Sequence, residues 1–189
     1  MLRRALLLTG VAGVGKSTVA DAIGGILSTA GFVTAVVDTD ALAQFGPPPA
    51  HGDSPGLGGP GLGGPGNGFY DYLKCINLAA VWANYQAAGA RVVVVSAGID
   101  SAPLRSKYVD SLAGCEVQMV RLVAATDTVR QRLHGRDSSA KLEGHLRTLT
   151  EEEASLEALA IEDFTVVNDR PATDVAREVI VRAGWTRHL

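Results

Sequence analysis

Short apolar runs alternate along the chain with longer segments in which apolar residues recur at helical spacing. The run at residues 91–95, RVVVV, is almost uninterrupted in β-branched residues, which is typical of a strand buried on both faces. The alternation predicts an α/β fold in which helices cover both faces of a parallel sheet. We expect strands at residues 5–8, 32–37, 91–95, 117–123 and 164–167, and helices at residues 16–29, 71–88, 101–112, 127–134 and 171–182.

A further helix is expected to begin at Thr150. Thr150 is followed three residues later by Glu153, which is the spacing of a capping box. The acidic residues at 151–153 also suit the positive end of a helix dipole.

One segment breaks the alternation. Residues 46–68 are almost all Gly and Pro, and the sequence PGLGG occurs at 55–59 and again at 60–64. Such a stretch buries too little apolar surface to offset the entropy of ordering it, so we expect a flexible insertion in a single domain of residues 1–189. It is either a tolerated surface insertion or a flap over a substrate site, and its position directly after Asp38 and Asp40 adds some support to the flap.

Composition narrows the class of partner. The 189 residues carry a formal net charge of −3, without the basic face of a nucleic-acid-binding protein. No apolar run is long enough to cross a bilayer, and the run at residues 5–8 is too short for a signal peptide. Cys75 and Cys115 are far apart in apolar stretches, so we expect buried thiols rather than a disulfide. These features predict a cytoplasmic protein that binds neither nucleic acid nor membrane.

Residues 10–17, GVAGVGKS, match the phosphate-binding pattern G-x-x-x-x-G-K-[ST] in full. The glycines let successive backbone N–H groups converge on an anion, and the helix that follows points its positive end at the same place. Lys16 is expected to reach the β and γ phosphates of ATP, and the Ser17 hydroxyl to ligate Mg²⁺. The expected nucleotide contacts are Gly10, Ala12, Gly13, Val14, Gly15, Lys16, Ser17 and Thr18.

The rest of the chain selects among proteins with this loop. We find neither the N-K-x-D segment nor the D-x-x-G switch of a GTPase, and Ser96 follows the third strand where motor ATPases carry a carboxylate. Instead, Asp38 and Asp40 end the second strand, with both side chains expected on one side of an extended chain. They could hold Mg²⁺ through water or accept the proton of an attacking hydroxyl, unless they are solvated acids of a turn.

Basic and amide side chains supply further candidates. Arg132 and Arg136 are four residues apart, share a helical face and could neutralise a transferred phosphoryl group. A solvated, salt-bridged helix is the alternative interpretation. Arg105 could bind an anionic group of the substrate, and Asn77, on one helical face with Asn84, could contact a polar acceptor.

These residues together resemble the small-molecule kinase branch of P-loop proteins, which includes gluconate, shikimate and adenylylsulfate kinases. The resemblance rests on residues 10–17, on Asp38-Thr39-Asp40, on residues 95–97 with Arg105 and Tyr108 downstream, and on Arg132-Leu133 followed by Arg136. It implies a three-layer sandwich around a five-stranded parallel sheet, and a mobile lid at about residues 135–147. It also implies that Arg132 flanks the adenine, that Arg136 meets the phosphates, and that Asp38 takes part at the magnesium and the acceptor hydroxyl.

The acceptor segment departs from these families. After the second strand we find neither the histidine-containing segment of gluconate kinases nor the aromatic and arginine set of adenylylsulfate kinases. We therefore predict an ATP- and Mg²⁺-dependent phosphotransferase acting on a hydroxyl of a small metabolite or natural product. Lys16, Asp38, Asp40 and Arg136 are its candidate catalytic residues, and Ser17 and Asp38 are its candidate metal residues. A regulatory ATP-binding module and a nucleoside or nucleotide kinase remain alternatives, and a monomer and a homodimer are both open.

Overall fold

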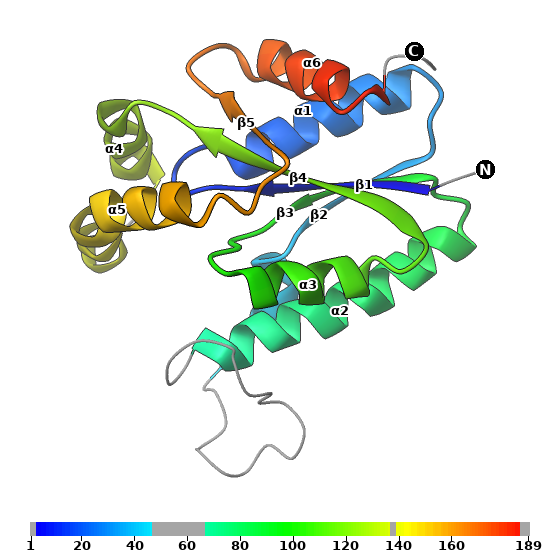
Figure 1. Cartoon of the computed structure of the whole chain (residues 1–189), viewed down its shortest axis with the longest axis horizontal. Helices are drawn as coiled ribbons and strands as arrows, with labels where there is room; N and C mark the ends of the chain where they lie inside the picture. The colour runs from blue at the N-terminus through cyan, green and yellow to red at the C-terminus, as the bar shows by residue number, and fades with distance from the viewer. Residues whose placement is uncertain (1–2, 47–66, 137–138, 186–189) are drawn as a thin grey trace.

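The computed structural model describes residues 3–46, 67–136 and 139–185 of the chain. Figure 1 shows an α/β arrangement in which helices lie on both sides of one central sheet. The elements follow in the order β1 (Arg3–Thr9), α1 (Lys16–Thr29), β2 (Thr34–Asp38), η1 (Ala41–Ala43), α2 (Asn67–Ala87), β3 (Val92–Ser96), α3 (Ala102–Ser111), β4 (Cys115–Val123), α4 (Thr126–Arg136), α5 (Ser139–Leu159), β5 (Phe164–Val167) and α6 (Ala172–Arg182).

The five strands are all parallel and lie in the order β2-β3-β1-β4-β5. The central strand β1 pairs with β3 on one side and with β4 on the other, so that Leu6 lies between Val94 and Gln118. All carboxyl ends therefore meet at one edge of the sheet, where α/β proteins bind their ligands. The predicted five-stranded parallel sheet is confirmed.

The alternation of side chains along β1 divides the core between the two faces of the sheet. Leu6 and Leu8 pack in the cluster that includes residues of α1 and α6, whereas Leu7 packs in the cluster with α2 and α3. In Figure 1, α1 and α6 cover one face and α2 and α3 the other. Trp82 and Tyr108 are fully buried in the second cluster and fill the space beneath α2 and α3.

The prediction of a helix start at Thr150 is wrong, because Thr150 lies inside α5. The apolar residues Leu142, Leu146 and Leu149 continue one stripe through this point and pack against the core, which favours an unbroken helix. Glu153 does not act in a capping box; its carboxylate accepts a 3.2 Å hydrogen bond from Thr126 at the start of α4.

Two predicted segments include residues that lie outside the described ranges. Helix α2 begins at Asn67, earlier than expected, and residues 47–66 of the predicted insertion lie outside the described residues. The predicted lid at about 135–147 includes residues 137–138, which also lie outside them; its remainder belongs to α4 and α5. The flap and the lid both stay predictions. None of the described helices combines the length and the apolar character that crossing a membrane requires.

Candidate active site

The loop between β1 and α1 has the backbone conformation that its glycines predict. Gly10 and Gly15 have φ of 133° and 99°, values that side chains rarely tolerate. A Cβ at Gly10 would lie 2.5 Å from the carbonyl oxygen of Leu122, and one at Gly15 would lie 2.5 Å from Nδ2 of Asn168. The loop thus fits closely against β4 and the segment after β5. Lys16 Nζ donates hydrogen bonds to the carbonyl oxygens of Gly10 (2.8 Å) and Val11 (3.0 Å).

A pair of side chains holds the far side of this loop. The carbonyl oxygen of Val14 accepts hydrogen bonds from Asn168 Nδ2 (2.7 Å) and from the Arg132 guanidinium (3.1 Å). Arg132 also donates to the carbonyl oxygen of Asn168 at 3.0 Å. The phosphate loop is therefore tied to both α4 and the end of β5, which keeps its backbone N–H groups in a fixed arrangement.

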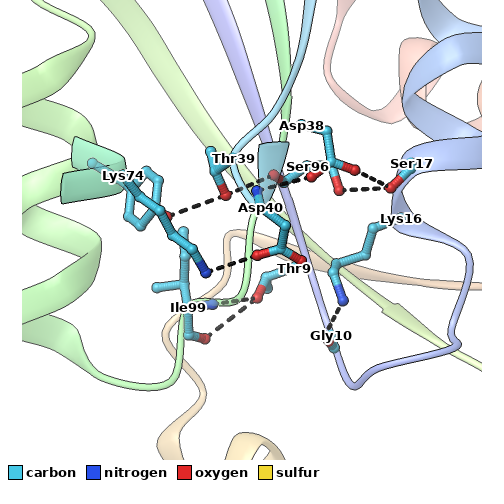
Figure 2. Close-up of polar contacts among 11 residues, drawn as sticks. Thr9, Gly10, Lys16, Ser17, Asp38, Thr39, Asp40, Lys74, Ser96 and Ile99 are labelled. Atoms are coloured by element: carbon cyan, nitrogen blue, oxygen red, sulfur yellow. Dashed lines mark hydrogen bonds and ion pairs between the residues drawn. The ribbon is translucent and has the colours of Figure 1, made fainter. Parts of the chain in front are cut away.

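Three oxygen-bearing side chains meet at the start of α1. Ser17 Oγ lies 2.5 Å from Asp38 Oδ2 and 3.2 Å from Ser96 Oγ (Figure 2). Hydroxyl and carboxylate oxygens are the ligands that Mg²⁺ prefers, so this group fits the predicted metal site. No three His, Cys, Asp or Glu side chains in the described ranges gather to hold a metal.

Asp40 lies in a turn rather than in an extended strand, because β2 ends at Asp38. Asp40 has φ −67° and ψ −30°, and its N–H donates a 2.9 Å hydrogen bond to Asp38 Oδ1. The turn directs its carboxylate away from that of Asp38 and toward α2, where Lys74 Nζ lies 2.7 Å away (Figure 2). The expectation that both carboxylates share one side of an extended chain is therefore wrong.

A buried hydrogen-bonded group supports the turn. The N–H and the hydroxyl of Thr39 both donate to the carbonyl oxygen of Ser96, each at 3.0 Å. Tyr108 in α3 donates to the Thr39 hydroxyl at 3.3 Å, and burial raises the pKa of the Tyr108 phenol. The phenol therefore stays protonated and acts as a donor. This group fixes the end of β2 against β3, so Asp38 and Asp40 on either side of Thr39 start from a rigid backbone.

Two adjoining cavities open at this edge of the sheet. The larger, of about 1090 Å³, lies along the phosphate loop. The smaller, of about 400 Å³, lies beside α2. Asp40 and Asp100 line both cavities and so mark the boundary between them. The smaller cavity is lined by Asp40, Ala43, Tyr70, Asp71, Lys74 and Asp100.

Most of the residues expected at the nucleotide line the larger cavity, namely Gly10, Ala12, Gly13, Gly15, Lys16, Ser17, Thr18 and Arg132. The candidate catalytic residues Asp38 and Asp40 line it as well. Val14 is not among the residues that line this cavity; its side chain is buried in the core and its carbonyl oxygen is bonded by Asn168 and Arg132, so its predicted nucleotide contact stays a prediction. The side chain of Arg136 lies outside the described residues, so its predicted phosphate contact is not tested.

Two predicted substrate residues have other partners. The Arg105 guanidinium pairs with Asp163 at 3.1 Å, and Asp163 in turn accepts a hydrogen bond from the Met119 N–H. Asn77 Nδ2 donates a 2.6 Å hydrogen bond to the carbonyl oxygen of Leu42 and so holds η1 against α2. Neither side chain is among the described residues that line the two cavities. Their predicted contacts with a substrate have no support in this geometry.

Several residues at the site were not predicted from the sequence to belong to it. Asn168 was visible only as a polar residue at the end of the last strand, a position that favours ligand contact in a parallel sheet. Lys74, Asp71 and Asp100 lie on elements that reach the site through the tertiary fold alone. His145 and Glu152, one above the other on α5, also line the larger cavity.

A phosphate-binding loop that opens α1 on a parallel sheet of order 2-3-1-4-5 defines the fold of the P-loop small-molecule kinases. Solved structures of kinases in this group have a similar fold. A sugar kinase from Janibacter sp. HTCC2649 is 17% identical, with a TM-score of 0.60 over 97% of this chain and 96% of that one. A gluconokinase from Sinorhizobium meliloti 1021 is 23% identical, with a TM-score of 0.58 over 98% and 93%. The Mycobacterium tuberculosis APS kinase, solved with AMPPNP and APS, is 19% identical, with a TM-score of 0.57 over 97% and 98%.

The predicted resemblance to this group is confirmed at the level of the fold, which shikimate kinases share as well. No protein-family model matches the chain, and no curated protein is detectably similar to it in sequence. The structures therefore show the fold of this chain, while its activity and any acceptor must be inferred from its own residues.

Proposed function

We propose that this chain is an ATP-dependent phosphotransferase that moves the γ-phosphate of ATP to a hydroxyl of a small metabolite or natural product. The observation that carries the proposal is the position of Asp40, whose side chain lines both the cavity along the phosphate loop and the smaller one beside α2. A carboxylate between a donor site and a second cavity is where in-line transfer to an acceptor needs a base.

The donor half would bind the triphosphate through the backbone N–H groups of residues 13–18 and the ammonium of Lys16. The Lys16 side chain already lies along the loop, and its position at the N-terminus of α1 adds the positive end of the helix dipole. Arg132 lines the same cavity, where its guanidinium can lie against the adenine while remaining bonded to the loop. The resemblance adds Arg136 as a phosphate ligand.

Ser17, with Asp38 behind it, would hold Mg²⁺. An ion held there would supply positive charge to offset the negative charge that develops on the leaving group. The 2.5 Å contact between the Ser17 hydroxyl and Asp38 keeps the hydroxyl oriented, and Ser96 restricts it from the other side. Asp38 is therefore assigned to the metal side of the site.

Asp40 is assigned to the acceptor. As the acceptor oxygen forms its bond to the γ-phosphorus, the bond from that phosphorus to the bridging oxygen breaks and ADP leaves with the electron pair. The proton of the acceptor hydroxyl passes to the Asp40 carboxylate. The backbone hydrogen bond from Asp40 to Asp38 and the ion pair with Lys74 fix where this carboxylate points.

The direct test is ADP release from Mg²⁺-ATP by the purified chain across a panel of hydroxyl-bearing metabolites. We expect acceptor-dependent ADP release that Lys16→Ala reduces by at least about 100-fold, because the lysine acts on the transferred group. Lys107→Ala is the matched control, since Lys107 lies over the Tyr72 ring and lines neither cavity. ATP binding without ADP release from any acceptor would favour a regulatory nucleotide-binding module instead.

A further inference from the structure

The charge of the smaller cavity bears on the chemical class of the acceptor. The cavity adjoins the larger, phosphate-loop cavity at Asp40 and Asp100. It is therefore a candidate acceptor site because of its position beside the donor site, and not because its lining is acidic. Its described lining carries three carboxylates, those of Asp40, Asp71 and Asp100, and a single basic side chain, that of Lys74.

Lys74 does not cancel this excess. Its ammonium lies 2.7 Å from the Asp40 carboxylate, and only 16% of the Lys74 side chain is exposed. Lys74 also attracts the Asp71 carboxylate, but its one ammonium faces three carboxylates, so the described lining keeps an excess of negative charge. Asp71, one helical turn before Lys74 on α2, and Asp100, after β3, remain as negative charges on the wall of the cavity.

The carboxylates are close enough to affect one another. Burial raises the pKa of Asp71, and the neighbouring charges of Asp100 and Asp40 raise it further, while Lys74 opposes them. Bringing these charges together therefore has an energetic cost, which a cation entering the cavity would offset. A carboxylate, sulfate or phosphate on the acceptor would instead meet repulsion.

A bare metal ion does not fit these charges, since the three carboxylates do not form a metal-binding group among the described residues. A cavity of about 400 Å³ has room for an organic molecule that bears both a hydroxyl and a charged group. We propose that the acceptor is a hydroxyl compound carrying a protonated amine, which Asp71 and Asp100 bind while its hydroxyl faces Asp40. The inference rests on the phosphotransfer proposed above.

Two series of hydroxyl compounds of similar size but different charge test it: glucosamine, glucose and glucuronate, and 2-deoxystreptamine, inositol and quinate. Binding is measured by calorimetry with the whole chain in the presence of Mg²⁺ and AMPPNP, and ADP release is measured with ATP. We expect the amine of at least one series to bind and react with a preference of about tenfold or more over its neutral counterpart, the scale of a charge-assisted contact. The carboxylate members should be the poorest.

Asp71→Asn and Asp100→Asn should each weaken amine binding by about tenfold, and so reduce the preference for the amine over the neutral member of the series. Asp110→Asn, an exposed carboxylate on α3 that lines neither cavity, is the charge control. Because Asp71 is partly buried, Asp71→Glu serves as a second variant, and it should restore the preference for the amine.

The outcomes separate the two proposals. Turnover that favours neutral or carboxylate members, or no binding by either amine, overturns the inference about the amine. Amine binding that depends on Asp71 and Asp100 but gives no ADP release with ATP supports the cation site and contradicts phosphotransfer.

Discussion

The side-chain amide of Asn168 donates a 2.7 Å hydrogen bond to the backbone carbonyl oxygen of Val14, a residue 154 positions earlier in the sequence. This contact joins the segment after β5 to the phosphate loop, and Arg132 reaches the same oxygen from α4. The shape of the loop therefore depends on residues from the second half of the chain.

Asn168→Ala should loosen the loop. Asn168 is 4% exposed, so its removal takes a buried hydrogen bond from Val14 and leaves a small void. We expect a loss of about 1–3 kcal/mol in the free energy of unfolding and an ATP affinity reduced by about tenfold. Denaturant unfolding and calorimetry measure the two effects. Asn84→Ala, an exposed residue of α2, is the control; an equal loss there would contradict a specific role for Asn168.

Two glycines, Gly15 and Gly25, should respond oppositely to alanine. Gly15→Ala meets both a φ of 99° and Asn168 Nδ2 at 2.5 Å, so it should destabilise the protein by about 1–3 kcal/mol and weaken ATP binding. Gly25→Ala, in the exposed part of α1 with nothing within 4 Å of the new Cβ, should stabilise it by about 0.5–1 kcal/mol. Thermal unfolding with and without ATP decides whether this contrast holds.

Replacing each of the two carboxylates of the Asp38-Thr39-Asp40 turn should have a different kinetic effect. Asp40→Asn is expected to lower kcat by at least about 100-fold while Mg²⁺-ATP binding is retained, because only the proton acceptor is lost. Asp38→Asn should instead raise the Mg²⁺ concentration needed for activity, because its partner is Ser17. Activity measured against Mg²⁺ concentration separates the variants. An Asp40→Asn enzyme with full kcat but weak ATP binding would reverse the assignment.

Cys75 and Cys115 should be poor nucleophiles in the folded protein. Both thiols are free, and burial raises the pKa of each to about 11. Alkylation at pH 8 should be slower than that of the unfolded chain by about 100-fold or more, and should accelerate as the pH approaches 11. The thiols bind their protons more tightly in the folded state than in the unfolded state. The free energy of unfolding should therefore fall as the pH rises from 9.0 toward 11. Rapid labelling at pH 8 without denaturant would contradict this.

The sequence was informative wherever the signal is local. The phosphate loop is contiguous, so residues 10–17 predicted both its conformation and its place between β1 and α1. The alternation of apolar runs predicted the parallel sheet, with boundaries a few residues off. The helix start at Thr150 failed because a capping box is also a local pattern, and the apolar stripe around Leu149 overrides it.

The residues around the proposed acceptor cavity could not be predicted from the sequence in this way. Lys74 and Asp40 belong to different elements, and nothing in the pattern of either predicts that α2 places the ammonium 2.7 Å from the carboxylate. Arg105 shows the reverse error. Its position after β3 favoured a substrate contact, yet the fold brings Asp163 to it instead. Contacts between distant elements depend on helix packing, which residue spacing alone does not specify.

The boundary between the two cavities at Asp40 and Asp100 also bears on how the proposed phosphotransferase could evolve. One cavity is built from the loop, α1, α4 and α5, and the other chiefly from η1 and α2, so the two share few side chains. If the chain is the phosphotransferase proposed above, substitutions at Tyr70 or Asp71 are expected to change the acceptor while ATP binding is retained, because both residues line only the smaller cavity. On that proposal, the acceptor specificity can diverge separately from the donor site, and directed evolution of a new specificity should begin at Tyr70 and Asp71.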